Sequence, residues 1–261
     1  GGDTNGDGIC DPTDASSTAA CPWPGSWRHI RIFSESEGSR FNHTIIRYGG
    51  KFFTWQNVGA KALWVEDTDI ELTNSVIEHS LLFGAYMVRS NSLIENNVFR
   101  FNKTGLLVAD NSDMIIQENM FLENERGLAL SSGESPTVLD NEFIGNTVVA
   151  AEYSGFGGMW QGNTAFENAL DGIMLSSNFG GGDAITTLFK NPMPYILTEE
   201  VLVPGAGTLR IEAGTVIKTL PRSALLVYGE FFADGTPEEK IIFEPLAPEV
   251  PAGAWKGIRI Y

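Results

Sequence analysis

A six-residue pattern that begins and ends with asparagine recurs through the middle of this chain and constrains its fold more than any other feature. Its copies read NVFRFN, NMFLEN, NEFIGN and NTAFEN, and their first residues are 22 apart, at Asn97, Asn119, Asn141 and Asn163. The segment at residues 74–79, NSVIEH, fits the pattern one step earlier at a spacing of 23. Self-similarity at a fixed period of this length indicates an architecture of stacked repeats.

The local pattern within each repeat favours short β-strands. Alternating segments of three to five residues end at Gly, Asn, Asp or Ser, whereas no segment has the helical spacing that a leucine-rich repeat needs. A β-propeller blade would need a period about twice as long. We therefore predict an all-β fold, a right-handed parallel β-helix (β-solenoid) with coils of about 22 residues. Successive coils of such a fold lie about 4.8 Å apart.

Stacking of the coils places equivalent residues in columns. We expect Phe99, Phe121 and Phe143 to form an internal aromatic stack, with Val76 and Ala165 at its two ends. Both asparagine columns are expected at turns, where side-chain amides can hydrogen-bond from coil to coil and where asparagine tolerates the left-handed conformation. This alignment places His79 in the second asparagine column.

Glycines recur in register with the asparagine pattern. They are expected in the turn that follows each copy, and Val149 replaces glycine in one coil. The glycines concerned are Gly84, Gly105, Gly127 and Gly172.

The C-terminal part of the chain resembles a known family. Residues 207–218 (GTLRIEAGTVIK), 233–236 (ADGT), 241–243 (IIF) and 255–258 (WKGI) resemble the repeat modules of large prokaryotic secreted or cell-surface β-helix proteins. In those modules this block leads into an acidic loop that reads GGDTNGDG, as residues 1–8 do here. The resemblance implies an extracellular or cell-surface location. It also implies a loop at 1–26, β-helix coils at 27–193 and coils of the next module, continuous with the first, at 194–261.

The N-terminal loop predicts a calcium site. Residues 3–14 follow the D-x-[DN]-x-[DN]-G pattern, in which alternate residues of a tight loop direct oxygen ligands at a hard cation. Gly8 permits the sharp turn, and Asp rather than Glu at the twelfth position resembles dockerin and thrombospondin-type loops. The predicted cofactor is Ca²⁺, and its expected ligands are Asp3, Asn5, Asp7, the Ile9 carbonyl, Asp11 and Asp14.

The chain contains two cysteines, Cys10 and Cys21, eleven residues apart in the same loop. A local disulfide between them is the interpretation we favour, and it indicates an oxidising compartment. Two unrelated free thiols are the alternative.

The charge balance excludes several partners. Thirty-three acidic residues stand against seventeen Lys and Arg, which gives a formal net charge of −16. Such a surface repels nucleic acid and anionic membranes, because binding to phosphate needs basic patches. No apolar run approaches the roughly 20 residues that a membrane span needs. We therefore expect neither a nucleic-acid partner nor membrane insertion.

No catalytic constellation is visible in the sequence, so we predict that the chain is not an enzyme. A glycoside hydrolase needs two carboxylates about 5–10 Å apart. The alignment places Glu78, Glu123 and Glu167 in one column, without a second acidic column opposite. The alternative is a carbohydrate-active or carbohydrate-binding β-helix, for which Tyr153 and Trp160 are the aromatic residues that we expect to be exposed.

The preferred function is a structural or adhesive module of an extracellular assembly. The segment Trp255–Tyr261 (WKGIRIY) echoes Trp27–Phe33 (WRHIRIF), and it ends in a strand pattern without a terminating Pro, Gly or helix. Solenoids need covered ends, because an open end presents unpaired backbone groups. We therefore expect contacts, head to tail, with copies of the chain or with adjoining β-helix modules; a polysaccharide is the alternative partner.

Overall fold

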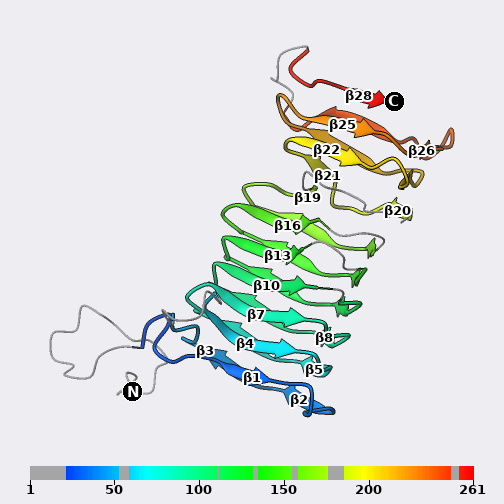
Figure 1. The fold of residues 1–261 in the computed structure, drawn as a ribbon. Coiled ribbons are helices and arrows are strands. Elements are labelled where there is room, and N and C mark those ends of the chain that lie inside the picture. Colours follow the sequence, from blue (N-terminus) through cyan, green and yellow to red (C-terminus); the bar gives the residue numbers. More distant parts are fainter. Residues whose placement is uncertain are drawn as a thin grey trace, which may run out of the picture.

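The computed structural model describes residues 22–52, 59–110, 112–131, 135–154, 158–175, 185–247 and 253–261. Within these ranges the chain forms twenty-eight strands, β1 to β28, and no helix. The strands wind into one elongated solenoid with the N-terminal coils at one end and the C-terminal coils at the other (Figure 1). All pairs of neighbouring strands are parallel and connect one coil to the next. The predicted parallel β-helix is confirmed.

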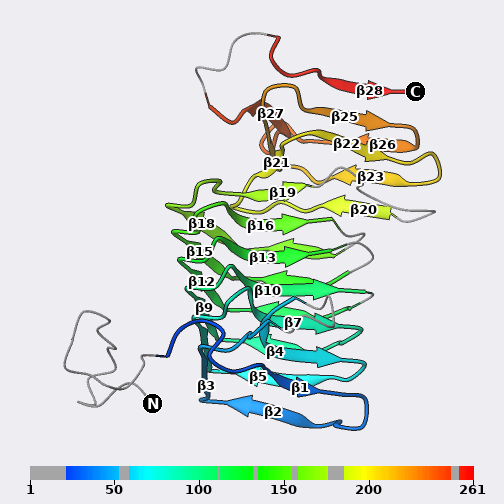
Figure 2. The same cartoon turned by 60° about the vertical axis from the view of Figure 1, so that its left-hand side comes forward.

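One sheet runs along the whole solenoid, and we call it the long sheet (Figure 2). Its first five strands are β1 (Ile30–Ile32), β4 (Lys61–Glu66), β7 (Phe83–Val88), β10 (Thr104–Ala109) and β13 (Arg126–Leu130). It continues through β16 (Val149–Tyr153), β19 (Ile173–Leu175), β21 (Tyr195–Leu197), β24 (Val216–Thr219) and β27 (Ile242–Pro245).

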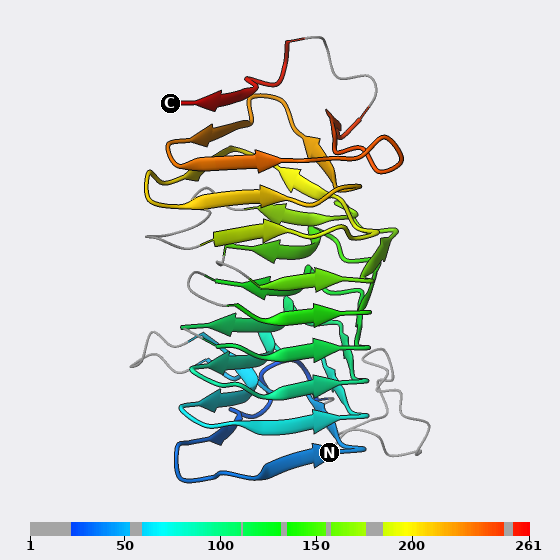
Figure 3. The same ribbon diagram turned by 90° about the vertical axis from the view of Figure 1, so that its right-hand side faces the viewer.

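Two six-stranded sheets close the lower coils, which lie one above another like rungs (Figure 3). The second sheet contains β2 (Ser39–Asn42), β5 (Ile70–Thr73), β8 (Leu93–Glu95), β11 (Ile115–Gln117), β14 (Thr137–Leu139) and β17 (Met159–Gln161). The third contains β3 (Ile45–Arg47), β6 (Val76–Glu78), β9 (Val98–Arg100), β12 (Met120–Leu122), β15 (Glu142–Ile144) and β18 (Thr164–Phe166).

Above these sheets the coils change shape while the long sheet continues. One three-stranded sheet contains β20 (Ile185–Leu188), β23 (Thr208–Ile211) and β26 (Glu230–Ala233). The other contains β22 (Glu200–Val203), β25 (Ala224–Val227) and β28 (Ile258–Ile260). The boundary that we predict between residues 193 and 194 falls between β20 and β21, close to this change.

The phenylalanine column forms as predicted. The ring centroids of Phe99 and Phe121 are 5.1 Å apart, those of Phe121 and Phe143 are 4.8 Å apart, and all three side chains are completely buried. Ala165 lies opposite Phe143 in the next coil, so this end of the stack is also confirmed. Burial of these rings contributes to the single hydrophobic core that fills the solenoid.

The other end of the stack corrects the alignment. Phe99 lies opposite Ile77, whereas Val76 lies opposite Val98, so the position predicted for Val76 is wrong. The coil spacing here is 22 and not 23, because the Ser75 amide donates to Asn97 Oδ1 at 2.9 Å and Ser75 therefore holds the column position of the first asparagine. Matching by residue type places Asn74 in the first asparagine column. The register is decided instead by the main-chain hydrogen bonds between coils, and these place Ser75 there.

The two asparagine columns hydrogen-bond between coils as expected. In the first column, Asn119 Nδ2 donates to the carbonyl of Ile94 at 2.8 Å and to Asn141 Oδ1 at 3.0 Å. Its own Oδ1 accepts from the main-chain amide of Asn97 at 2.9 Å. The second column repeats this arrangement with Asn102, Asn124, Asn146 and Asn168. The buried amides from Asn97 to Asn163 thus have their partners, which removes the free-energy cost of burying them. The first column ends at Asn191, whose Oδ1 accepts from the Asn163 amide at 2.9 Å and whose Nδ2 has no hydrogen-bond partner among the described residues.

His79 does not belong to the second column, contrary to the prediction. Ser80 takes that position, and its amide donates to Asn102 Oδ1 at 2.9 Å. His79 adopts a positive φ of 53° and stacks outside the coil between Tyr48 and Phe101.

The left-handed conformation occurs at the residue before each ladder asparagine and not at the asparagine itself. Asn96, Glu118 and Asp140 have φ of 55°, 55° and 51°, and they precede Asn97, Asn119 and Asn141. The left-handed residue turns the chain at the corner and is exposed or only partly buried, while the following asparagine is buried. The prediction that left-handed tolerance explains the ladder residues is therefore wrong: they are retained for their amides.

Three of the recurring glycines, Gly84, Gly105 and Gly127, lie within strands of the long sheet and not in turns, and Gly172 comes directly before β19. Gly127 lies in β13, and its equivalent in the next coil is Ala150, not Val149 as predicted. A Cβ at Gly127 would lie 2.5 Å from the Ala150 carbonyl oxygen and 2.7 Å from Phe143 Cδ1. Gly105 and Gly127 therefore make room for the phenylalanine stack and for the close approach of the next coil.

We expect Phe121→Ala to destabilise the protein by roughly 3–5 kcal/mol, because the coils above and below hold the cavity open. Denaturant-induced unfolding would measure the difference. Phe166→Ala is the matched control, since Phe166 lies in the same sheet but is 41% exposed. Equal losses of stability in the two variants would contradict the assignment of the column.

Candidate functional site

The predicted calcium loop and disulfide lie outside the described residues. This applies to the ligands Asp3, Asn5, Asp7, Ile9, Asp11 and Asp14 and to the pair Cys10 and Cys21. These sites therefore stay predictions. Within the ranges that the structure describes, no group of three or more His, Cys, Asp or Glu side chains could hold a metal ion.

A charged column marks the corner where the long sheet ends and the chain turns toward the second sheet. Asp67, Arg89 and Asp110 each follow directly after a strand of the long sheet, β4, β7 and β10. All three have a positive φ, of 57°, 48° and 57°. This conformation is uncommon for arginine, so interactions at the corner have to stabilise it.

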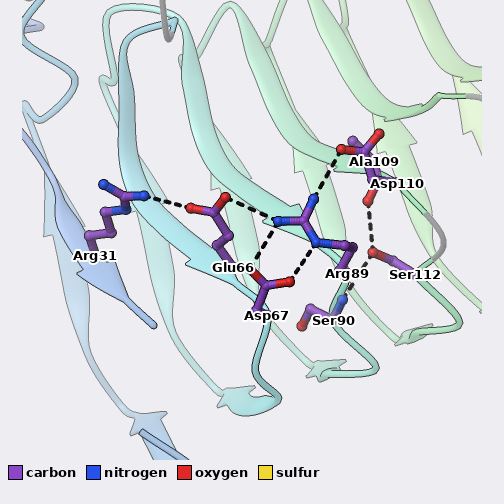
Figure 4. A network of polar contacts seen from close by, with 8 residues as sticks. All are labelled: Arg31, Glu66, Asp67, Arg89, Ser90, Ala109, Asp110 and Ser112. Carbon is purple, nitrogen blue, oxygen red and sulfur yellow. Dashed lines mark hydrogen bonds and ion pairs between the residues drawn. The ribbon is translucent and has the colours of Figure 1, made fainter. Parts of the chain in front are cut away.

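Arg89 lies at the centre of these interactions (Figure 4). Its Nε donates to Asp67 Oδ1 at 2.5 Å, and its two terminal nitrogens contact Glu66 at 3.2 Å and Asp110 at 3.3 Å. Glu66 also accepts from Arg31 Nη2 at 2.6 Å. The hydrogen bond from Arg89 lowers the pKa of Asp67. The network joins four successive coils, and each of the three guanidinium nitrogens of Arg89 donates to a carboxylate.

A column of hydroxyl groups lies next to the charged column. Ser112 Oγ donates to the Ala109 carbonyl at 2.9 Å and accepts from the Ser90 amide at 3.1 Å (Figure 4). Thr68 is the equivalent residue one coil below Ser90. Thr68 is only 6% exposed, yet its Oγ1 has no hydrogen-bond partner among the described residues. The hydroxyl column thus ends on an unpartnered group.

A groove opens at this end of the column. It consists of two adjoining cavities, with volumes of about 390 Å³ and about 330 Å³, that share Gly38 and Asp69. The larger cavity is also lined by Glu37, Asp67, Thr68 and Arg89. The other is lined by Ser39, Arg40, Ile70, Glu71, Asn91 and Leu93. Each cavity is lined by residues of the same three successive coils, so the two cavities lie side by side along the direction of the strands.

Cations and aromatic rings alternate on the outer face of the long sheet near this corner. The Arg31 guanidinium lies 3.9 Å from the Phe33 ring centroid and 3.5 Å from that of Trp64. Lys61 Nζ lies 3.8 Å from the Trp64 ring centroid and 4.2 Å from that of Tyr86. Such contacts stabilise the cations through the negative faces of the rings. We call these five residues the cation–aromatic stack.

Lys61 is unusual within the stack because it is only 2% exposed. Burial and the positive charge of Arg31 lower its pKa to about 8, and the charge of Glu66 only partly opposes this shift. The amine therefore loses its proton at a lower pH than an exposed lysine does, and it occupies a buried position where a lysine is rarely found.

Two other predicted features are not sites. Tyr153 and Trp160 are buried against each other, with ring centroids 5.6 Å apart, so the prediction that they are exposed is wrong. Glu78 does not share a column with Glu123 and Glu167. It lies opposite Arg100 and forms an ion pair with it at 2.7 Å. The error for Glu78 follows from the alignment, which assigned its column without the actual register.

The groove and the stack were not predicted, although part of their signal is in the sequence. The alternating charges of Asp67, Arg89 and Asp110 recur at spacings of 22 and 21 and could have been recognised as a column. The stack could not, because Arg31 lies opposite Trp64, which is 33 residues away and does not follow the repeat period.

The chain matches a known protein family over residues 36–186, which is more than half of its length. The family is described as the right handed beta helix region. The chain belongs to this family. No curated protein and no solved structure matches the chain. Membership in the right-handed β-helix family establishes the fold, whereas a fold by itself does not determine an activity.

In this right-handed β-helix protein, none of the described segments is a helix long and apolar enough to cross a membrane.

The pKa of Lys61 predicts a pH dependence of stability. Its value of about 8 in the folded protein lies below the ordinary value of 10.5. Between these two pH values the unfolded chain binds more protons, so the wild-type free energy of unfolding should rise with pH by up to about 3 kcal/mol. Urea-induced unfolding at a series of pH values would measure this: between pH 8 and pH 10.5 the free energy of unfolding of the wild type should rise relative to that of Lys61→Met. Lys103→Met, at an exposed position, is the control; parallel curves for the wild type and Lys61→Met would contradict the prediction.

Proposed function

We propose that the chain is a structural or adhesive module of an extracellular or cell-surface assembly, in which β-helix modules stack end to end. The observation that carries the proposal is the open core at the ends of the described solenoid. Ile258 and Ile260 of β28 lie opposite Leu225 and Val227, which belong to the core. Ile260 is nevertheless 62% exposed, because no residue from the described part of the chain packs on the outer side of this last coil.

The opposite end has the same character. Ile30 and Ile32 of β1 lie opposite the core residues Leu63 and Val65, and Phe41 of β2 lies opposite Leu72. These three side chains are only partly buried. β1, β2 and β3 are each the terminal strand of a sheet, as β26, β27 and β28 are at the other end. Parallel edges with apolar columns are surfaces on which a further coil can pair and pack.

The two ends are also related in sequence. β1 and β28 carry the equivalent segments of the echo between Trp27–Phe33 and Trp255–Tyr261, and both are edge strands. Contact between unlike ends is heterologous, so repetition extends a filament instead of closing a ring. Covalently joined modules and separate copies would use the same surfaces.

The extracellular location is part of the proposal. The favoured disulfide between Cys10 and Cys21, the calcium loop and the net charge of −16 support it. Catalysis is not part of the proposal. The carboxylates that the sequence singled out include Glu78, which is paired with Arg100 instead of facing a second acid.

We expect the purified chain to form end-to-end oligomers whose length increases with concentration. Ile260→Lys should shift the population to monomers, because a charge on an edge strand opposes the docking of a further coil. Analytical ultracentrifugation and electron microscopy would measure the change.

Ile115→Lys is the matched control. Ile115 is 44% exposed but lies in β11, an interior strand of its sheet, so this variant should assemble like the wild type. A wild-type chain that stays monomeric at every concentration, with both terminal coils folded, would contradict the proposal.

The calcium prediction can be tested separately. Calorimetric titration should show one Ca²⁺ bound per chain, and Asp7→Ala should abolish this binding because it removes a ligand at the centre of the loop. Chelation should leave the unfolding of the β-helix unchanged, since the coils have their own core. Asp113→Ala, at an exposed position outside the loop, is the control. Absence of binding at millimolar calcium would contradict the prediction.

A further inference from the structure

The first and last strands of the described solenoid are two copies of one structural element. β1 and β28 have the same sequence, Ile-Arg-Ile, and a Gly-x-Trp motif precedes both, in residues 25–33 (GSWRHIRIF) and 253–261 (GAWKGIRIY). Gly25 and Gly253 both adopt the left-handed conformation, with φ of 88° and 81°. The two segments therefore begin with the same turn and end in the same strand.

Each of these strands is hydrogen-bonded along one edge only, and the bonded edges are opposite. β1 pairs with β4 in the coil that follows it, and β28 pairs with β25 in the coil that precedes it. In both pairs the two isoleucines lie opposite a leucine and a valine of the core, which are Leu63 and Val65 in β4 and Leu225 and Val227 in β25. A single Ile-Arg-Ile strand thus fits between β25 of one copy and β4 of a second copy, with main-chain partners along both edges.

The tryptophan before each strand indicates the same arrangement. Trp27 Nε1 donates to the carbonyl of Arg47, the last residue of β3, at 2.8 Å. Trp255 holds the equivalent position after β27, and its ring stacks on that of Phe243 with the centroids 6.2 Å apart. Its Nε1 is buried and has no hydrogen-bond partner in the described part of the chain, which costs free energy. A strand equivalent to β3 that pairs with β27 would supply the missing carbonyl.

We propose that copies of this chain assemble by strand exchange, in which β28 of one copy takes the place of β1 in the next copy. Residues 22–33 of the next copy then leave the solenoid, and its β2 and β3 pair with β26 and β27 of the first. The inference rests on the end-to-end assembly proposed above, for which it names the contact surfaces and the register. Because β28 then pairs with β4, the long sheet of the next copy continues the sheet of β22, β25 and β28.

The exchange replaces like with like at the surface of β4. The Arg31 guanidinium lies 3.5 Å from the Trp64 ring centroid and pairs with Glu66 at 2.6 Å. Arg259 carries the same group at the same position of β28. Exchange of an identical element between protomers is a low-cost route to association. The gain comes from the edges of β26 and β27, which have a neighbouring strand on one side only before assembly.

The connection between β1 and β2 allows this movement. Residues 34–38 (SESEG) consist of polar residues and glycine and are mostly exposed. β1 is the terminal strand of the long sheet and has β4 as its only neighbouring strand there. Its release is therefore a local opening at the end of the solenoid and not an unfolding of the core.

The test compares two matched variants, Ile30→Lys in β1 and Ile258→Lys in β28, by sedimentation velocity of the full chain over a range of concentrations. Ile258→Lys should raise the concentration needed for half-assembly about tenfold, because a charge replaces an apolar side chain that enters the core. Ile30→Lys should lower that concentration, since it weakens the strand that β28 has to displace. Docking of a further coil onto an intact β1 predicts the opposite for Ile30→Lys, so reduced assembly in both variants would overturn the exchange.

Disulfide trapping measures the exchange directly. A Val65→Cys chain is mixed with an Ile260→Cys chain and oxidised, and mass spectrometry of the peptides identifies the link. Val65 lies opposite Ile32 within one chain, so exchange places position 260 of the other copy there and the intermolecular disulfide should form. Met87→Cys is the matched control in place of Val65→Cys. Met87 lies in the same column one coil further, roughly 10 Å from position 260 and too far for a disulfide.

Strand exchange and end-to-end assembly can fail separately. Oligomers in which Val65→Cys and Ile260→Cys do not cross-link would overturn the exchange but not the assembly. A chain that stays monomeric at every concentration would overturn both. Circular dichroism of each variant separates a change in assembly from a loss of the fold.

Discussion

Hydrogen bonds of the buried asparagine amides between coils are the interaction on which the other columns depend. The strands of the second and third sheets are mostly three residues long, so each provides few main-chain hydrogen bonds. At the corners between them, Asn119 and its equivalents bond to the coil below and to the coil above. These bonds hold the corner at the inter-strand distance and keep the register from slipping, which a short strand alone would allow.

The core follows from that register. Because Asn97, Asn119 and Asn141 repeat every 22 residues, the phenylalanines two positions later meet face to face. Their rings occupy the space that a Cβ at Gly105 or Gly127 would need. A ladder, an aromatic stack and a column of small residues therefore depend on one another, and a change in one column is transmitted to its neighbours.

The exposed side of each corner is where the coils differ. The left-handed residue before a buried position points outward and is free to vary, so it carries aromatic rings in the column of His79 and Phe101 and charges in that of Asp67 and Arg89. In the first coils, the charged corner and the groove lie next to the cation–aromatic stack. The ion pair of Arg31 with Glu66 connects the stack to the charged corner. A fold with a repetitive interior thus presents a local surface that is not repetitive.

The sequence by itself determined the fold class, the length of a coil, the phenylalanine stack and the hydrogen-bonded asparagine columns, because a strict period forces identical residues to stack. It also predicts the calcium loop from local spacing, a prediction that remains to be tested. Only the tertiary structure decided the register of the first coils, where Ser75 and Ser80 replace asparagine, and the pairing of Arg31 with Trp64. It alone showed that Thr68 Oγ1 has no hydrogen-bond partner among the residues that the structure describes. The reason is physical: a period specifies which residues are equivalent, whereas contacts between residues outside the period depend on how far each loop displaces the chain before the next coil begins.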